Sequence, residues 1–282
     1  MSSPLAFTKL EALGNDFVLI DARQRNLKLT PDTVRALADR RHGIGCDQVL
    51  VLAPARDADC LLAVKVYNAD GSPAEQCGNG LRAIGLWLLE RGEISETTRL
   101  FTDGGKVRVG PGDNGQILVE LPPPDFRPAA WGYIGDSPDQ LMVDLGDRPR
   151  PAAGVSIGNP HLVVEVDHPV SADEVLAAGK FAASEPRLNN GANIGLARVM
   201  ARDHVDLKVC ERGAGPTPAC GSGACAAASL LIRAGRINSP ASIEQPGGTL
   251  VIHWPGGSQP ITMTGPARLI FEGNLGWPNL RP

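Results

Sequence analysis

The feature that most constrains this chain is a short stretch that occurs twice. Each copy is a cysteine followed by two glycines one residue apart, directly ahead of an apolar run. The copies are Cys77-Gly78-Asn79-Gly80 and Cys220-Gly221-Ser222-Gly223. Each apolar run has helical spacing and stops before a glycine, Gly92 or Gly235, so each cysteine is expected at a helix N-terminus.

The spacing around the two copies indicates an internal duplication. Asn68 stands as far ahead of Cys77 as Glu211 stands ahead of Cys220, and both follow an apolar strand pattern. Asn15 and Asn159, each after a glycine, precede their cysteines by distances that differ by one residue. Agreement of several independent offsets favours one structural plan used twice.

The rest of the chain is predicted to alternate strands with a few helices. A turn over Gly14-Asn15-Asp16 is expected to join two strands, and Thr30 is expected to cap a helix that continues to Arg41 and stops at Gly43. The high glycine and proline content, 33 and 24 residues, favours strands joined by tight turns. Further strands are expected near residues 49–52, 61–67, 97–102, 106–109, 116–121, 162–166, 205–210, 249–254, 261–263 and 268–272, and a further helix at 172–179. Three consecutive prolines at 122–124 mark the expected boundary between the halves.

Composition limits the function. The net charge is −4 with no dense cluster of basic residues, which argues against nucleic acid as a partner. The longest nearly apolar run, Ala224–Ile232, is too short to span a bilayer, and the N-terminus lacks the pattern of a signal peptide. We therefore expect no membrane association and a cytoplasmic location.

The six cysteines do not have zinc-ligand spacing, so no metal site is expected. Most should be free thiols in a reducing compartment. Cys46, Cys60, Cys210 and Cys225 are expected to serve as small buried hydrophobes.

Cys77 and Cys220 carry the candidate chemistry. A helix N-terminus offers unpaired N–H donors and partial positive charge, which favour an anion and lower the pKa of a thiol. Two such termini facing one carboxylate would let one thiolate remove a proton from the adjacent carbon while the opposite thiol returns one. This chemistry inverts the carbon and requires no cofactor. His161 and Glu211 are candidates for bases that set the protonation of the thiols.

Seven motifs together resemble the diaminopimelate epimerase family, and they occur in the family's order from about Phe7 to Glu272. They are Gly14-Asn15-Asp16-Phe17, Asn68-Ala69-Asp70-Gly71-Ser72, Cys77-Gly78-Asn79-Gly80, Gly158-Asn159-Pro160-His161, Ala192-Asn193-Ile194-Gly195, Glu211-Arg212-Gly213-Ala214-Gly215 and Ala219-Cys220-Gly221-Ser222-Gly223-Ala224-Cys225-Ala226.

The resemblance implies cofactor-independent conversion of LL- to meso-diaminopimelate, in lysine and peptidoglycan precursor biosynthesis, by a homodimer. It implies an α/β fold of two pseudo-symmetric domains, each a β-barrel-like mixed sheet around a central helix. The first domain would be residues 1–121 together with residues 264–282, which return to it at the end of the chain. The second domain would be residues 122–263.

The resemblance also assigns site residues. Cys77 and Cys220 would be the acid/base pair, assisted by His161 and Glu211. The residues implied to bind substrate are Asn15, Gln48, Asn68, Gly78, Asn79, Asn159, Asn193, Glu211, Arg212, Gly221 and Ser222. Cys46 and the prolines Pro216 and Pro218 depart from the usual family pattern, and the tail after Glu272, including Trp277, lies outside the resemblance.

Three alternatives remain open from the sequence. A proline or hydroxyproline racemase-type enzyme would use the same two-thiol chemistry, although Asn159, Asn193 and Arg212 favour a substrate with a second polar head group. A catalytically inactive amino-acid-binding module would not need both cysteines. A zinc site is the third alternative, and it has the least support in the spacing.

Overall fold

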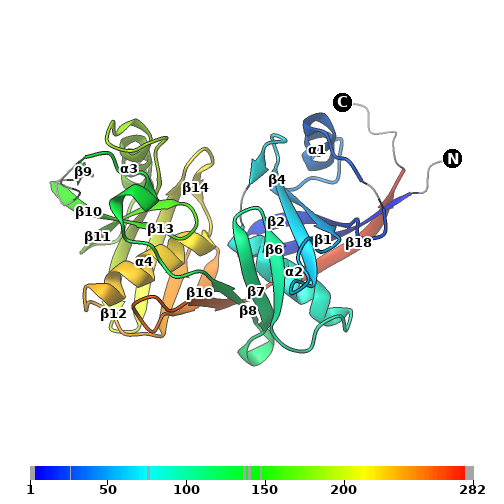
Figure 1. Cartoon of the computed structure of the whole chain (residues 1–282). Coiled ribbons are helices and arrows are strands. Elements are labelled where there is room, and N and C mark those ends of the chain that lie inside the picture. The colour runs from blue at the N-terminus through cyan, green and yellow to red at the C-terminus, as the bar shows by residue number, and fades with distance from the viewer. Residues whose placement is uncertain are drawn as a thin grey trace. The chain divides into compact units, whose positions relative to one another are not determined.

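A computed structural model describes residues 4–25, 27–74, 77–135, 138, 141–146 and 148–276. The chain divides into two compact units. Unit 1 contains the residues up to Val119 and those from Gly265 onward, and unit 2 is Glu120–Thr264. The chain therefore returns to unit 1 at its end, where the last strand pairs with the first (Figure 1). Trp277 lies outside the described residues.

Unit 1 is built from a mixed sheet in which β18, β1, β2, β3, β4, β6 and β7 pair in that order. Its helices are α1 (Pro31–Ala38) and α2 (Gly78–Glu90). Its strands are β1 (Leu5–Ala12), β2 (Asn15–Asp21), β3 (Gln48–Ala53), β4 (Leu62–Asn68), β5 (Pro73–Ala74), β6 (Thr98–Thr102), β7 (Gly105–Pro111), β8 (Ile117–Leu121) and β18 (Arg268–Leu275).

Unit 2 repeats this plan, with β9, β10, β11, β12, β13, β15, β16 and β17 paired in that order. Its helices are α3 (Ala172–Ser184) and α4 (Gly221–Arg233). Its strands are β9 (Met142–Asp144), β10 (Pro149–Ser156), β11 (Pro160–Val166), β12 (Asn193–Ala201), β13 (His204–Glu211), β14 (Gly215–Thr217), β15 (Ala241–Gln245), β16 (Gly248–His253) and β17 (Ile261–Gly265).

The duplication extends to strand register. β2 and β3 are parallel with Phe17 opposite Gln48, and β11 and β12 are parallel with His161 opposite Asn193. A short strand then folds back in each unit, which pairs Pro73 with Tyr67 and Pro216 with Cys210. The predicted α/β fold of two pseudo-symmetric halves is confirmed.

The helix that follows each cysteine is the central element of its unit. α2 contacts β1, β2, β7 and β18, and α4 contacts β10, β11, β12 and β16. Leu81, Ala83 and Ile84 are at most 2% exposed, although Ala83 points to the opposite side of α2 from Leu81. A helix that is apolar all round must be enclosed. Its enclosure fixes the position of its N-terminus, and with it the cysteine.

Two local expectations were wrong. α1 ends at Ala38 rather than near Gly43, because the Asp39 carboxylate accepts the backbone N–H groups of Arg41 and His42 and so competes with the helix. The first turn lies at Leu13 and Gly14, both with positive φ, so Asn15 and Asp16 begin β2 instead of forming the turn.

The short or polar strands β5, β9, β10, β14 and β15 were not predicted. In the described part of the chain, no helix is both long and apolar enough to cross a membrane.

The packing of α2 can be tested at Gly85. A Cβ at this position would lie 2.7 Å from Ile117 Cγ2, so Gly85→Ala should destabilise the protein by about 1–3 kcal/mol, despite the gain in helix propensity of roughly 1 kcal/mol. Urea unfolding measures the change. Ile117→Ala removes the contacting methyl, so the double variant should be more stable than the sum of the single losses predicts. A Gly85→Ala variant as stable as wild type would contradict the close enclosure of α2.

Candidate functional site

Cys77 caps α2, as the sequence predicts. The backbone N–H of Gly80 donates to its sulfur at 3.3 Å, and its thiol donates to Asn15 Oδ1 at 3.9 Å. Cys77 is half-buried. A cap formed by sulfur instead of oxygen leaves a proton-transfer group at the positive end of the helix dipole.

Gln48 and Asn68 lie on neighbouring strands opposite one another, at the end of the sheet where Asn15 begins β2. Gln48 Nε2 donates to Asn68 Oδ1 at 2.9 Å, and Asn68 Nδ2 donates to Ser72 Oγ at 3.0 Å. Gln48 Oε1 is buried and has no partner in the described part of the chain. A buried acceptor without a donor is costly, and a bound donor group would satisfy it.

Asn79, buried in the first turn of α2, accepts a hydrogen bond from Arg82 Nη2 at 2.9 Å. Neither α2 nor α4 carries an acidic side chain in its first turn, whereas α1 and α3 both do. The N-termini at Gly78 and Gly221 therefore keep their partial positive charge for an anion.

Cys220 caps α4 with matching geometry. Its sulfur accepts the Gly223 N–H at 3.3 Å, and its backbone φ and ψ are −123° and 111°, against −137° and 106° at Cys77. Cys220 is more deeply buried, at 4% exposed, and Ser222 Oγ lies 3.5 Å from its sulfur.

His161 is joined to Cys220 through Ser222. Its Nε2 lies 3.0 Å from both Ser222 Oγ and Asn159 Oδ1, and Asn159 Nδ2 donates to Ser222 Oγ at 3.4 Å. Burial lowers the pKa of His161 to about 3, and the positive charge of Arg212 acts in the same direction. The ring is therefore neutral near pH 7.

Glu211 and Cys220 are close enough to influence each other's pKa, and Thr217 Oγ1 donates to Glu211 Oε1 at 2.6 Å. Burial raises the pKa of the Glu211 carboxyl. Burial also raises the pKa of the Cys220 thiol well above its usual value, and the charge of Glu211 adds to this rise. Cys220 is thus a thiol near pH 7, with the Glu211 carboxyl close by.

Asn193 connects the remaining predicted residues of unit 2. Its Nδ2 lies 3.4 Å from His161 Nε2, and its Oδ1 accepts the backbone N–H of Arg212 at 2.8 Å. The predicted residues therefore form two groups. Unit 1 holds Asn15, Gln48, Asn68, Cys77, Gly78 and Asn79, and unit 2 holds Asn159, His161, Asn193, Glu211, Arg212, Cys220, Gly221 and Ser222.

The sequence did not indicate several residues that support these groups. Gln245 Oε1 accepts the backbone N–H of Cys220 at 2.8 Å, although the side chain arrives from β15, which was not predicted. Thr217, which lies between Pro216 and Pro218, donates a hydrogen bond to Glu211. Asp47, next to Gln48, holds Asn15. Of these three, only Asp47 is next to a predicted site residue in the sequence, and Gln245 and Thr217 carried no such signal.

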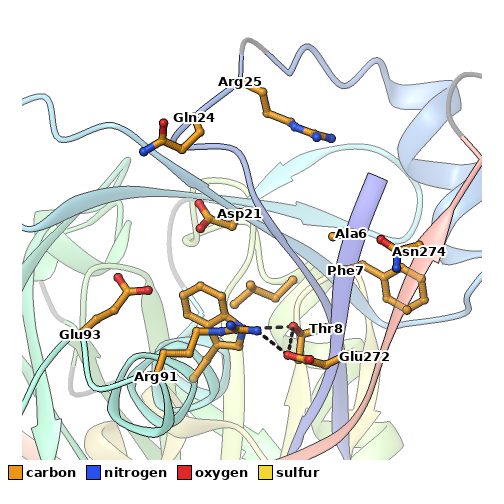
Figure 2. Close-up of a pocket in the computed structure, with 13 residues that line it drawn as sticks. Ala6, Phe7, Thr8, Asp21, Gln24, Arg25, Arg91, Glu93, Glu272 and Asn274 are labelled. Carbon is orange, nitrogen blue, oxygen red and sulfur yellow. Dashed lines mark hydrogen bonds and ion pairs between the residues drawn. The ribbon is translucent and has the colours of Figure 1, made fainter. Parts of the chain in front are cut away.

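A cavity of about 510 Å³ in unit 1 contains none of the predicted site residues (Figure 2). Arg91 lies over the Trp87 ring, 4.4 Å from its centroid, and is hydrogen-bonded to Glu272. Thr8 accepts the Trp87 indole N–H at 3.1 Å. The polar groups of these residues bond to one another. We therefore take the two cysteine caps, and not this cavity, as the candidate site.

The four other cysteines are buried, and burial raises the pKa of Cys46 to about 12. Their burial agrees with packing roles. Among the described residues, no group of three or more potential ligands could hold a metal ion.

The chain is similar to known proteins along almost its whole length. The family model for diaminopimelate epimerase matches residues 7–126 and 154–270. The diaminopimelate epimerase of Halorhodospira halophila is 41% identical, over 97% of this chain and 96% of that protein. The O-ureido-serine racemase of Streptomyces lavendulae is 42% identical, over 97% and 96%.

Solved structures show the same fold at low identity. The crystal structure of a probable proline racemase from Agrobacterium radiobacter K84 covers 97% of this chain and 93% of its own, with a TM-score of 0.70 and 14% identity. That likeness concerns the fold alone. The family model and the relatives at 41–42% identity go further, and they confirm that this chain belongs to the diaminopimelate epimerase family.

Proposed function

We propose that this chain is an amino-acid epimerase that interconverts LL- and meso-diaminopimelate by two-thiol proton transfer. The observation that carries the proposal is the matched pair of cysteine N-caps on enclosed helices, in a chain of this family. The reaction contributes to lysine and peptidoglycan precursor biosynthesis. We further propose a cytoplasmic homodimer whose two domains are residues 1–121 with 264–282, and residues 122–263.

The proposed reaction takes place at one carbon. One cysteine thiolate removes the α-proton, and the other cysteine thiol gives its proton to the opposite face of the resulting carbanion. After turnover, the first cysteine is a thiol and the second is a thiolate. The protein is then in the correct protonation state to convert the product back to the substrate. The N–H groups at Gly78 and Gly221 bind the substrate carboxylate and stabilise the charge that develops beside it. No cofactor is needed to balance these proton transfers.

Glu211 and His161 have different roles in this proposal. Glu211 accepts the Cys220 thiol proton directly, and its raised pKa brings the two groups closer in proton affinity. His161 stays neutral and orients Ser222 against the Cys220 sulfur. Asn15, Gln48, Asn68 and Asn79 from unit 1, with Asn159, Asn193 and Arg212 from unit 2, are proposed to bind the substrate's polar groups.

Racemisation of O-ureidoserine is a second candidate function, because the Streptomyces lavendulae relative is as similar to this chain as the epimerases are. Both substrates carry the same reacting amino-acid group and differ at the distal end. The proline racemase alternative has less support, since the likeness to a probable proline racemase is at 14% identity.

The proposal is tested by incubating the purified protein with LL-diaminopimelate, L-O-ureidoserine and L-proline separately, without added cofactor. We expect inversion of diaminopimelate with a higher kcat/KM than for either other substrate, measured by chiral chromatography. Faster turnover of O-ureidoserine would favour the second candidate, and turnover of proline alone would overturn the assignment.

Matched variants identify the acid/base groups in the same assay. Cys77→Ala and Cys220→Ala should each abolish inversion, whereas Cys60→Ala, which alters a buried thiol remote from both caps in the sequence, should retain it. Full activity in either of the first two variants would refute the two-thiol scheme.

The neutrality of His161 predicts a pH effect on stability. The native pKa is about 3 and the unfolded value is 6.5. Between these values the unfolded chain binds a proton that the native protein does not. As the pH is lowered through this range, the free energy of unfolding should therefore decrease, by up to about 1.4 kcal/mol per pH unit. His161→Gln removes this term, so the stability difference between wild type and variant should shrink from about pH 7 to about pH 5 in urea unfolding. A difference that does not change with pH would mean that His161 titrates normally in the folded protein.

A further inference from the structure

The amide of Asn15 is held between a carboxylate and the Cys77 thiol. Its Nδ2 donates to Asp47 Oδ2 at 3.0 Å, and its Oδ1 accepts from Cys77 Sγ at 3.9 Å. The reverse orientation would place the amide oxygen against the Asp47 carboxylate, which can only accept hydrogen bonds. Asp47 therefore determines which end of the amide faces the sulfur.

Asp47 is itself fixed by reciprocal contacts with Asp16. Asp47 Oδ2 accepts the backbone N–H of Asp16 at 3.1 Å, and Asp16 Oδ1 accepts that of Asp47 at 2.9 Å. Arg40 Nη2 bridges the two carboxylates at 2.7 Å, and Lys9 Nζ lies 2.6 Å from Asp16. Burial raises the pKa of Asp16, but the hydrogen bonds from Arg40 and Lys9 outweigh it and hold the pKa well below its usual value.

Two cations and two anions make this cluster neutral overall. It therefore places little net charge near Cys77, and its influence passes through the orientation of Asn15. The amide oxygen stabilises the thiol form of Cys77 and opposes the thiolate, whereas an amide N–H in its place would do the reverse.

Unit 2 lacks this arrangement. The common strand register places Ala192 where unit 1 has Asp47, because Asn193 and Gln48 are equivalent. Asn159, the counterpart of Asn15, turns its Nδ2 toward Ser222 and its Oδ1 toward His161. The control of amide orientation by a carboxylate is thus a property of the Cys77 half alone.

We propose that Asp47 is a positioning residue that fixes the Asn15 amide with its oxygen toward Cys77, and so holds Cys77 as the proton-carrying thiol in the resting enzyme. The mechanistic meaning of this inference rests on the proposed function, since it assigns a starting protonation state to one of the two acid/base groups.

The test measures the pKa of Cys77 from the pH dependence of its alkylation by iodoacetamide, followed on the Cys77 peptide by mass spectrometry, because only the thiolate reacts. In Asp47→Ala the amide is free to turn its N–H groups to the sulfur, so the pKa should fall by about one unit. The shift should vanish when Asp47→Ala is made in an Asn15→Ala background, because the effect passes through that amide. Arg40→Gln is the control: it breaks the same cluster but keeps the bond from Asp47 to Asn15, so the Cys77 pKa should not fall.

An unchanged pKa in Asp47→Ala, or a shift of equal size in the Asn15→Ala background, would overturn the inference. Should Asp47→Ala fail to fold, Asp47→Asn keeps the side-chain shape, and a fall in pKa is still expected because the new amide must satisfy Arg40 as well as Asn15. Alkylation does not depend on turnover. A wild-type protein without epimerase activity would contradict the proposed function while leaving this measurement valid.

Discussion

The bond from a helix N–H to a cysteine sulfur is the interaction on which the candidate chemistry depends. It occurs at Gly80 and at Gly223, at the same distance of 3.3 Å. A hydroxyl or carboxylate would cap these helices equally well but would not transfer protons as readily near neutral pH. Enclosure of α2 and α4 by their sheets fixes each sulfur, so a buried helix of each unit carries its reactive group.

The two halves share a scaffold but not a chemical environment. At Cys77 the sulfur meets an amide oxygen and is half-buried. At Cys220 it is fully buried beside a carboxylate and a serine, with a neutral histidine beyond. In the proposed reaction the two sulfurs take opposite roles, and the two environments suit this: Glu211 can take the proton of Cys220, while the amide oxygen keeps the proton on Cys77.

The sequence predicted the parts of this fold that follow from local patterns. The caps at Thr30, Cys77 and Cys220, and the duplicated strands and helices, follow from residue type and spacing. The end of α1 could not be predicted, because it depends on the competing hydrogen bonds of Asp39. The contact of Gln245 with Cys220 depends on strand pairing across β15, which short polar sequences do not reveal. The low pKa of His161 depends on burial, which appears only in the folded chain.

The central claim is that two thiols handle the two proton transfers, and deuterium incorporation tests it directly. One pure stereoisomer of diaminopimelate is incubated in deuterated water, and both isomers are analysed by mass spectrometry at low conversion. Two separate acid/base groups predict that newly formed product carries deuterium at the inverted carbon while the remaining substrate keeps its original hydrogen. Product that retains the substrate's own hydrogen would show that a single group removes and returns it, and would contradict the account.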